Sequence, residues 1–192
     1  MAWKKDGSTT LPSAGNNVTV SSLTDNKFSL VLSTTIADSS GGTQQSLQFN
    51  GDPLSNYGRR YNSGDGSTDG ANNSTRISTG AATAANSIGF TVNYVCNITG
   101  KEKMAISFGG DTYTLGSSAP SRFEAVGKWA NTTAIDRIDI FNPTSGNFQS
   151  GSVSSVIGSD GVESMTVQDG AVYYETDTNK AYVLYNNSWN EL

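Results

Sequence analysis

Residues 88–108 read IGFTVNYVCNITGKEKMAISF, and this stretch decides the fold. Apolar side chains occupy alternate positions in its first half: Ile88, Phe90, Val92 and Tyr94. Alternation with period two is the pattern of a β-strand. The sequence Asn-Ile-Thr-Gly at 97–100 predicts a turn, after which alternation resumes over 101–108. We therefore expect two antiparallel strands, the first of them a core strand with its apolar side chains buried.

The same pattern continues outward in both directions. Alternating apolar segments lie at 18–23, 28–36, 47–49, 75–79, 121–129, 138–140 and 153–157. Glycine, asparagine and aspartate turns separate them, as in Asn50-Gly51-Asp52-Pro53. Eight or nine short strands at this spacing predict an all-β protein, and a jelly-roll-like antiparallel β-sandwich over residues 1–158 is the arrangement that we expect. In 121–129 an aromatic face alternates with a charged face, which suits a sandwich with one solvated side.

The composition fits this fold and excludes several classes of function. Hydrophobic residues make up 35% of the 192 residues and charged residues 15%, with a net charge of −5. Serine, threonine, asparagine and glycine fill the difference, as expected for short strands joined by polar turns. The acidic balance argues against a nucleic-acid surface, which needs clustered lysine and arginine. No apolar run approaches the roughly 18 residues of a membrane span, and residues 1–7 lack the apolar stretch of a secretion signal.

Catalytic chemistry finds little support in the residue types. The chain has no histidine, which removes Ser-His-Asp and Cys-His arrangements and the commonest zinc ligand. Paired carboxylates could still hydrolyse a glycosidic bond, but Glu102 and Glu124 are flanked by cationic residues and read as solvated charges. The single cysteine, Cys96, lies in an apolar run and is expected to be a buried small hydrophobe. We expect a non-enzyme without cofactor or metal.

The stretch from Tyr57 to Asn73 is expected to contain a long exposed loop, because residues 62–70 hold no apolar anchor. Aromatic and cationic side chains flank it: Tyr57, Arg59, Arg60 and Tyr61. Since tyrosine combines an apolar ring with a polar tip, these residues are the candidate site for a glycan or receptor. Asp65 and Asp69 are spaced as in some calcium loops, but the loop lacks a third acidic position and the terminal glutamate.

Residues 159–192 are expected to form a separate C-terminal β-hairpin module. A strand-like run at 172–174 precedes a polar turn in which Asn179 can adopt the left-handed conformation, and a second run follows at 182–185. The module carries five large aromatic residues: Tyr173, Tyr174, Tyr182, Tyr185 and Trp189. An isolated hairpin is marginal in water, and aromatics are enriched at interface centres. We therefore expect these residues to contact another subunit or a larger shell.

Several stretches resemble structural proteins of tailed phages and related viruses. Leu47-Gln48-Phe49-Asn50-Gly51-Asp52 followed by Asn56-Tyr57, the segments 101–103 and 119–131, and the segment 135–151 are similar to a recurring signature of these proteins. Residues 169–180 and 187–189 resemble hairpins that end many phage fibre and particle proteins.

This resemblance implies a virion structural protein that is made in the host cytoplasm and carried on the particle surface. The leading expectation is a jelly-roll capsid decoration protein, a homotrimer that binds the major capsid protein or other virion proteins. One alternative is a receptor- or carbohydrate-binding module of a phage tail or head fibre that contacts a host-surface glycan. Another is a cellular sugar-binding domain unrelated to viruses.

Overall fold

The computed structural model describes residues 3–38, 42–63, 68–112, 117, 119–160, 170–186 and 188–192, without the side chains of 81–83. Every regular element in these ranges is a β-strand, which confirms the all-β prediction. The chain divides into two compact units, Met1–Gly161 and Val162–Leu192, whereas the sequence placed the boundary at 158. None of the described residues forms a helix that could cross a membrane.

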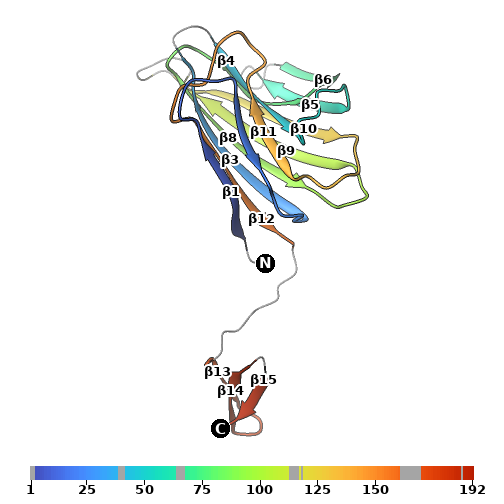
Figure 1. The fold of residues 1–192 in the computed structure, drawn as a ribbon, viewed down its shortest axis with the longest axis vertical. Helices are drawn as coiled ribbons and strands as arrows, with labels where there is room; N and C mark the ends of the chain where they lie inside the picture. The colour runs from blue at the N-terminus through green and yellow to red at the C-terminus, as the bar shows by residue number, and fades with distance from the viewer. Residues whose placement is uncertain are drawn as a thin grey trace. The chain divides into compact units, whose positions relative to one another are not determined.

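The first unit contains two antiparallel sheets. The large sheet has eight strands in the order β1 (Lys4–Thr10), β12 (Val153–Ser159), β3 (Phe28–Ile36), β8 (Ile88–Cys96), β9 (Lys103–Asp111), β10 (Ser121–Trp129), β5 (Tyr57–Ser63) and β6 (Thr68–Ser74) (Figure 1). The small sheet has four, in the order β2 (Asn17–Ser21), β11 (Arg137–Phe141), β4 (Thr43–Phe49) and β7 (Ile77–Thr83). The small sheet packs on the large one through contacts of β2 with β1 and β12 and of β7 with β8, β9, β10 and β5.

Eight of these strands pair as in a jelly roll. With the β5–β6 and β9–β10 hairpins set aside, the first strand pairs with the last, β1 with β12, and the second with the next to last, β2 with β11. The remaining four follow the same nested rule, β3 with β8 and β4 with β7. A long hairpin rolled into two sheets produces this order, so the predicted jelly-roll sandwich is confirmed. The two extra hairpins both extend the large sheet beyond β8.

The apolar core lies between the small sheet and one part of the large sheet. Its largest members are Phe49 of β4, Tyr57 of β5 and Trp129 of β10, whose ring centroids lie 5.7 to 6.3 Å apart. All three are almost completely buried. Burying side chains of this size stabilises a fold by about 1.5–3 kcal/mol each, so this cluster holds the two sheets together. The predicted core strands of β2, β4 and β11 contribute the isoleucine, leucine and valine around it.

Asn50, Asp52 and Trp129 belong to one hydrogen-bonded unit in this core. Asn50 and Gly51 both have positive φ and turn the chain after β4. The Asn50 amide accepts hydrogen bonds from the backbone of Asp136 and Arg137 and donates to the Ala134 carbonyl. The Asp52 carboxylate accepts from the Trp129 indole at 2.7 Å. Burial alone would raise the pKa of Asp52, but its hydrogen bonds outweigh burial and lower that pKa. The hydrogen bonds of Asn50 and Asp52 therefore stabilise the fold.

The long loop expected around residues 62–70 is wrong for the described residues 62, 63 and 68–70, because they belong to the paired strands β5 and β6. Backbone hydrogen bonds to β10 hold β5 in place without an apolar alternation. Gly70 lies opposite Tyr61, and a side chain at Gly70 would collide with the Tyr61 ring. The first strand, β1, was also missed, since its residues Lys4–Thr10 carry no apolar signal. The first unit has twelve strands in its described part rather than eight or nine.

The second unit is a small antiparallel sheet of three strands, β13 (Val172–Glu175), β14 (Lys180–Tyr185) and β15 (Ser188–Glu191). The predicted hairpin is its first part, and Asn179 has the left-handed φ of 54° that its turn was expected to need. The third strand was not predicted. It pairs with β14, so that Trp189 lies opposite Leu184.

Candidate functional site

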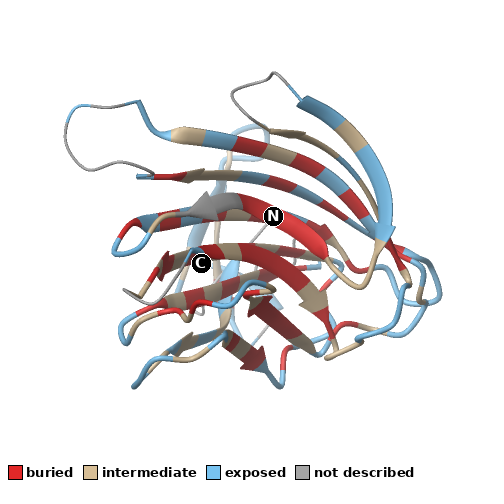
Figure 2. Ribbon diagram, turned by 90° about the horizontal axis from the view of Figure 1, so that it is seen from above, coloured by how far each residue is buried: buried red, intermediate tan, exposed pale blue. Residues whose placement is uncertain are grey.

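The face of the large sheet that points away from the small sheet is apolar. On β8 the side chains of Ile88, Phe90 and Tyr94 are 46 to 50% exposed, while Thr91 and Asn93 are buried. The expectation that the apolar set of this strand is buried is therefore wrong. The same inversion occurs on β3 and β9, where serines, threonine, alanine and glycine alternate inward with apolar residues outward (Figure 2). We call this surface the outer face.

Small polar side chains explain why the interior accepts this inversion. Ser33 and Ser154 share a hydrogen bond of 2.9 Å inside the sandwich, and the Thr91 hydroxyl donates to the Gln45 side chain at 2.9 Å. A Cβ atom added at Gly109 would collide with the Thr79 carbonyl of β7, so the two sheets lie too close here for larger residues. Each such hydrogen bond contributes about 1 kcal/mol net, and the buried side chains of Val31, Val95, Ala105 and Val156 add apolar packing to this part of the interior.

The apolar side chains of the outer face form continuous rows across the strands. One row runs through five strands in register: Ile157, Leu30, Tyr94, Ile106 and Val126. The next row contains Leu32, Val92 and Phe108. Side chains directly opposite each other in antiparallel strands lie in contact distance, so these rows form one surface. Monomeric proteins rarely expose contiguous apolar patches of more than a few hundred Å².

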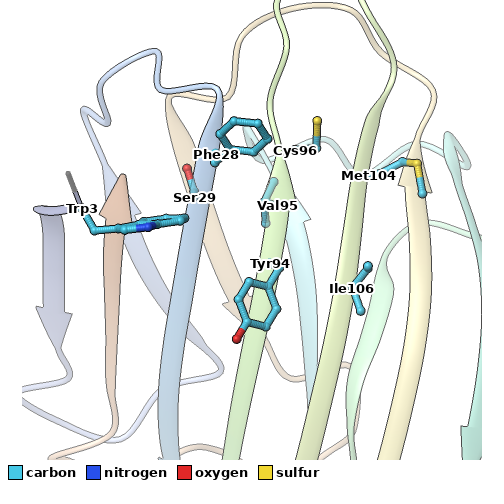
Figure 3. A pocket seen from close by; sticks show the side chains of 8 residues that line it. All are labelled: Trp3, Phe28, Ser29, Tyr94, Val95, Cys96, Met104 and Ile106. Carbon is cyan, nitrogen blue, oxygen red and sulfur yellow. The ribbon is translucent and has the colours of Figure 1, made fainter. Parts of the chain in front are cut away.

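The outer face contains a hollow of about 320 Å³ near the end of β8 (Figure 3). Its lining is almost entirely apolar and includes Trp3, Phe28, Tyr94, Met104 and Ile106. Cys96 also lines the hollow and is partly exposed, so the expectation that it is buried is wrong. Soft side chains such as methionine adapt to varied apolar partners. The hollow can therefore accept an apolar side chain that projects from a docked surface.

Charged residues border the outer face on the side of β10, β5 and β6, and they pair with one another. Arg60 lies 3.6 Å from Asp69, Arg122 lies 3.7 Å from Glu124, and Lys128 lies 2.8 Å from Glu102. Exposed ion pairs contribute at most about 1 kcal/mol to stability. These three ion pairs make this edge of the outer face electrically neutral, because each cation is matched by an anion.

The four residues of the candidate glycan site do not form one site. Tyr57 is 1% exposed, and its ring is stacked on Trp129 in the core, so it cannot contact a ligand. Arg59 lies 4.5 Å over the Tyr61 ring, which stacks in turn on Phe123 of the inner face. Arg60 points to the outer face, where it pairs with Asp69. Successive residues of a strand point to opposite faces. Because no strand was expected here, we did not expect these side chains to separate.

The other predicted positions lie in different surroundings. Residues 64–67 of the possible calcium loop, Asp65 included, lie outside the described residues, and Asp69 is paired with Arg60. No group of three or more potential metal ligands occurs among the residues that the structure describes. The aromatic residues of the second unit are exposed except Tyr182, which is half-buried. Their predicted contact with another subunit or a shell stays a prediction.

Comparison with known proteins assigns no family: no protein-family model matches this chain, and no curated protein is similar to it.

The sequence pattern identified the outer-face residues of β8, but we expected them in the interior. The signal that could have corrected this lies in the alternate set of the same strands. The intervening residues in β3 are Ser29, Val31, Ser33 and Thr35, which are small enough to pack between two close sheets. When one face of a strand is apolar and its other face carries serine and threonine, either face can be the buried one.

Proposed function

We propose that this protein is a non-catalytic structural protein of a virus particle, which assembles into a homo-oligomer through its outer face and decorates the viral shell. The observation that carries the assembly part is the continuous apolar outer face over a sandwich interior that is partly polar. Covering that face removes apolar area from water, at about 25 cal/mol per Å², and so adds to the stability of the fold.

A second copy of the chain is the partner that the border charges favour. Each cation of the border is already paired with an anion of the same subunit. Two identical surfaces can then meet without the repulsion between like charges that a net charge would cause. Stable interfaces bury about 800 Å² on each side, and the rows on five strands are wide enough to contribute to such an area. Closed symmetry is the usual outcome for homo-oligomers, and a trimer is our expectation.

The virion part of the proposal rests on two further observations. The signature over 47–151 is similar to that of structural proteins of tailed phages, and jelly rolls are common in viral capsid proteins. Shell decoration and a fibre are the two roles that this resemblance leaves open, and we propose decoration. The copy number in purified particles separates these roles: hundreds of copies support decoration, and about a dozen would contradict it.

Two matched substitutions test the assembly. Ile106 in the outer face and Ile98 in the β8–β9 turn are both 43% exposed. Ile106→Asp places a carboxylate in the proposed interface, where an unpaired buried charge costs several kcal/mol, whereas Ile98→Asp leaves it in water. In sedimentation velocity at micromolar concentration, we expect the unmodified protein and Ile98→Asp to be oligomeric and Ile106→Asp to be monomeric. A monomeric unmodified protein, or an oligomeric Ile106→Asp, would contradict the proposal.

A further inference from the structure

One face of the three-stranded sheet in the second unit presents a cluster of aromatic rings. Tyr173 lies opposite Tyr182 and Leu184 opposite Trp189, which places all four on the same face. The Tyr173 ring is at its centre: it stacks on Tyr182 with the centroids 6.0 Å apart and meets the edge of Trp189 at 5.9 Å. Leu184 is buried beside them. We call this surface the aromatic platform.

The aromatic platform borders a groove of about 480 Å³, lined by Ala171, Val172, Tyr173, Glu175, Tyr182 and Trp189. Tyr173 is 49% exposed and Trp189 45%, so about half of each side chain is available to a ligand. The remaining half is held by the contacts between the rings. Small-molecule sites typically combine an apolar lining with a few polar groups that fix orientation, and the volume of this groove lies in their range.

Charged groups on the same face define what the groove can bind. The Glu175 carboxylate accepts hydrogen bonds from the Thr178 hydroxyl at 2.5 Å and the Tyr182 hydroxyl at 3.4 Å, both at the same oxygen, and it has no ion-pair partner among the described residues. Lys180 is neutralised by Glu191 at 2.8 Å, and this hydrogen bond raises the pKa of Lys180. The groove therefore offers the second carboxylate oxygen of Glu175 as a hydrogen-bond acceptor beside the rings, and Lys180 on the same face is already paired.

We propose that the aromatic platform binds a neutral saccharide. A pyranose ring has one face of C–H groups and a rim of hydroxyls. The C–H face carries slight positive charge and matches the negative faces of aromatic rings. A rim hydroxyl can donate to Glu175, and hydrogen bonds to a carboxylate are stronger than neutral ones. An acidic ligand would be repelled by Glu175.

The opposite face of the same sheet supplies the control positions. Tyr174 and Tyr185 alternate with the platform residues and point to the other face. They are 54% and 70% exposed, so their replacement by alanine removes as much aromatic surface without touching the groove. This inference does not depend on the outer face or on assembly, and failure of either proposal leaves the other intact.

The test measures saccharide binding by the full chain with saturation-transfer NMR and calorimetry. The probes are neutral oligosaccharides of glucose, galactose, mannose and N-acetylglucosamine, an acidic oligogalacturonate, and choline as a cation. We expect a neutral oligosaccharide to bind, and Tyr173→Ala to weaken that binding at least about tenfold. Tyr174→Ala and Tyr185→Ala should leave it unchanged.

Glu175→Gln serves as a second variant, because it keeps the shape of the side chain and removes only its charge. We expect it to retain weakened saccharide binding and an unchanged far-ultraviolet circular dichroism spectrum. The proposal is overturned if no neutral oligosaccharide binds, if only choline or oligogalacturonate binds, or if Tyr174→Ala and Tyr185→Ala reduce binding as much as Tyr173→Ala and Glu175→Gln do.

Discussion

The Tyr57 hydroxyl lies in the apolar core and makes both of its hydrogen bonds with Phe49. It accepts from the Phe49 N–H at 3.0 Å and donates to the Phe49 carbonyl at 3.3 Å. Burial raises the pKa of Tyr57 above its usual value, and the charges of Asp52 and Asp139 add to this shift. The ring therefore anchors β5 to the core, and its hydroxyl links β5 to β4.

This shift predicts a loss of stability at alkaline pH. Above about pH 10 the unfolded chain releases the Tyr57 proton while the folded protein keeps it, so the free energy of unfolding falls by up to about 1.4 kcal/mol per pH unit. Tyr57→Phe removes this contribution. At pH 8 the variant should be less stable by about 1–3 kcal/mol, because the buried Phe49 N–H loses its acceptor. At pH 11 the difference should shrink by about 1 kcal/mol.

Urea unfolding at the two pH values measures this difference. The other tyrosines are the same in the two proteins, so their contributions cancel in the difference. A difference that is the same at pH 8 and pH 11 would show that the Tyr57 hydroxyl does not titrate on unfolding.

Strands β7 and β9 cross closely because glycines lie where they meet. A Cβ atom at Gly109 would overlap the Thr79 carbonyl and lie 3.1 Å from the Gly80 Cα atom. Backbone cannot move aside as a flexible side chain can, so overpacking here should be costly. We expect Gly109→Ala to lower the free energy of unfolding by about 2–3 kcal/mol.

Gly15→Ala is the matched control, since nothing lies within 4 Å of a Cβ atom at that position. It should change stability by less than about 0.5 kcal/mol. Thermal unfolding followed by calorimetry compares the two variants. Equal melting temperatures for Gly109→Ala and Gly15→Ala would mean that the sheets can separate at this crossing without loss.

Most strands were predictable from their alternation, except β1, β5, β6 and β15, which carry little of it. The buried face of a strand was predictable only where its two faces differ in polarity. In β10 the aromatic face opposes charges, and the predicted burial of Phe123 and Trp129 is confirmed. In β8 the apolar set opposes Thr91 and Asn93, which are buried through hydrogen bonds and close sheet packing. The sequence of one strand does not contain that information, because it depends on β4 and β7 across the interior.

The outer face was not predicted as a surface for the same reason: its exposure depends on distant strands. Tyr57, Arg59, Arg60 and Tyr61 were predicted to form one site because no strand was expected at β5. Without the period of a strand, Tyr57 to Tyr61 form one cluster in the sequence. In the strand, Tyr57 lies in the core, Arg59 and Tyr61 lie on the inner face, and Arg60 lies on the outer face. Pairing of β5 with β10 involves residues more than sixty positions apart, which local patterns do not reveal.

Because the chain divides into two units, we expect stability and assembly to depend on the first unit and saccharide binding on the second. The core and the outer face lie within Met1–Gly161, whereas the aromatic platform lies within Val162–Leu192. A chain that ends at Gly161 should therefore keep the melting temperature and the oligomeric state of the first unit. It should lose saccharide binding, and it should lose attachment to virus particles if the exposed tyrosines contact the shell.

Calorimetry, sedimentation and co-purification with particles measure these three properties on the same truncated protein. Unfolding of the truncated chain would show that the second unit is needed for the stability of the first. Retention of both its oligomeric state and its particle attachment would contradict an interface formed by residues 163–192.

The nested pairing of the jelly roll also sets the order in which the chain can fold. Lys4 of β1 pairs with Gly158 of β12, so β1 cannot pair until β12, more than 140 residues later in the chain, has been synthesised. Contacts between residues so distant in sequence make folding slow. Meanwhile the apolar residues of β3, β8 and β9 are already synthesised and unprotected, a state that favours aggregation. Newly made chains would then depend on chaperones until β12 emerges.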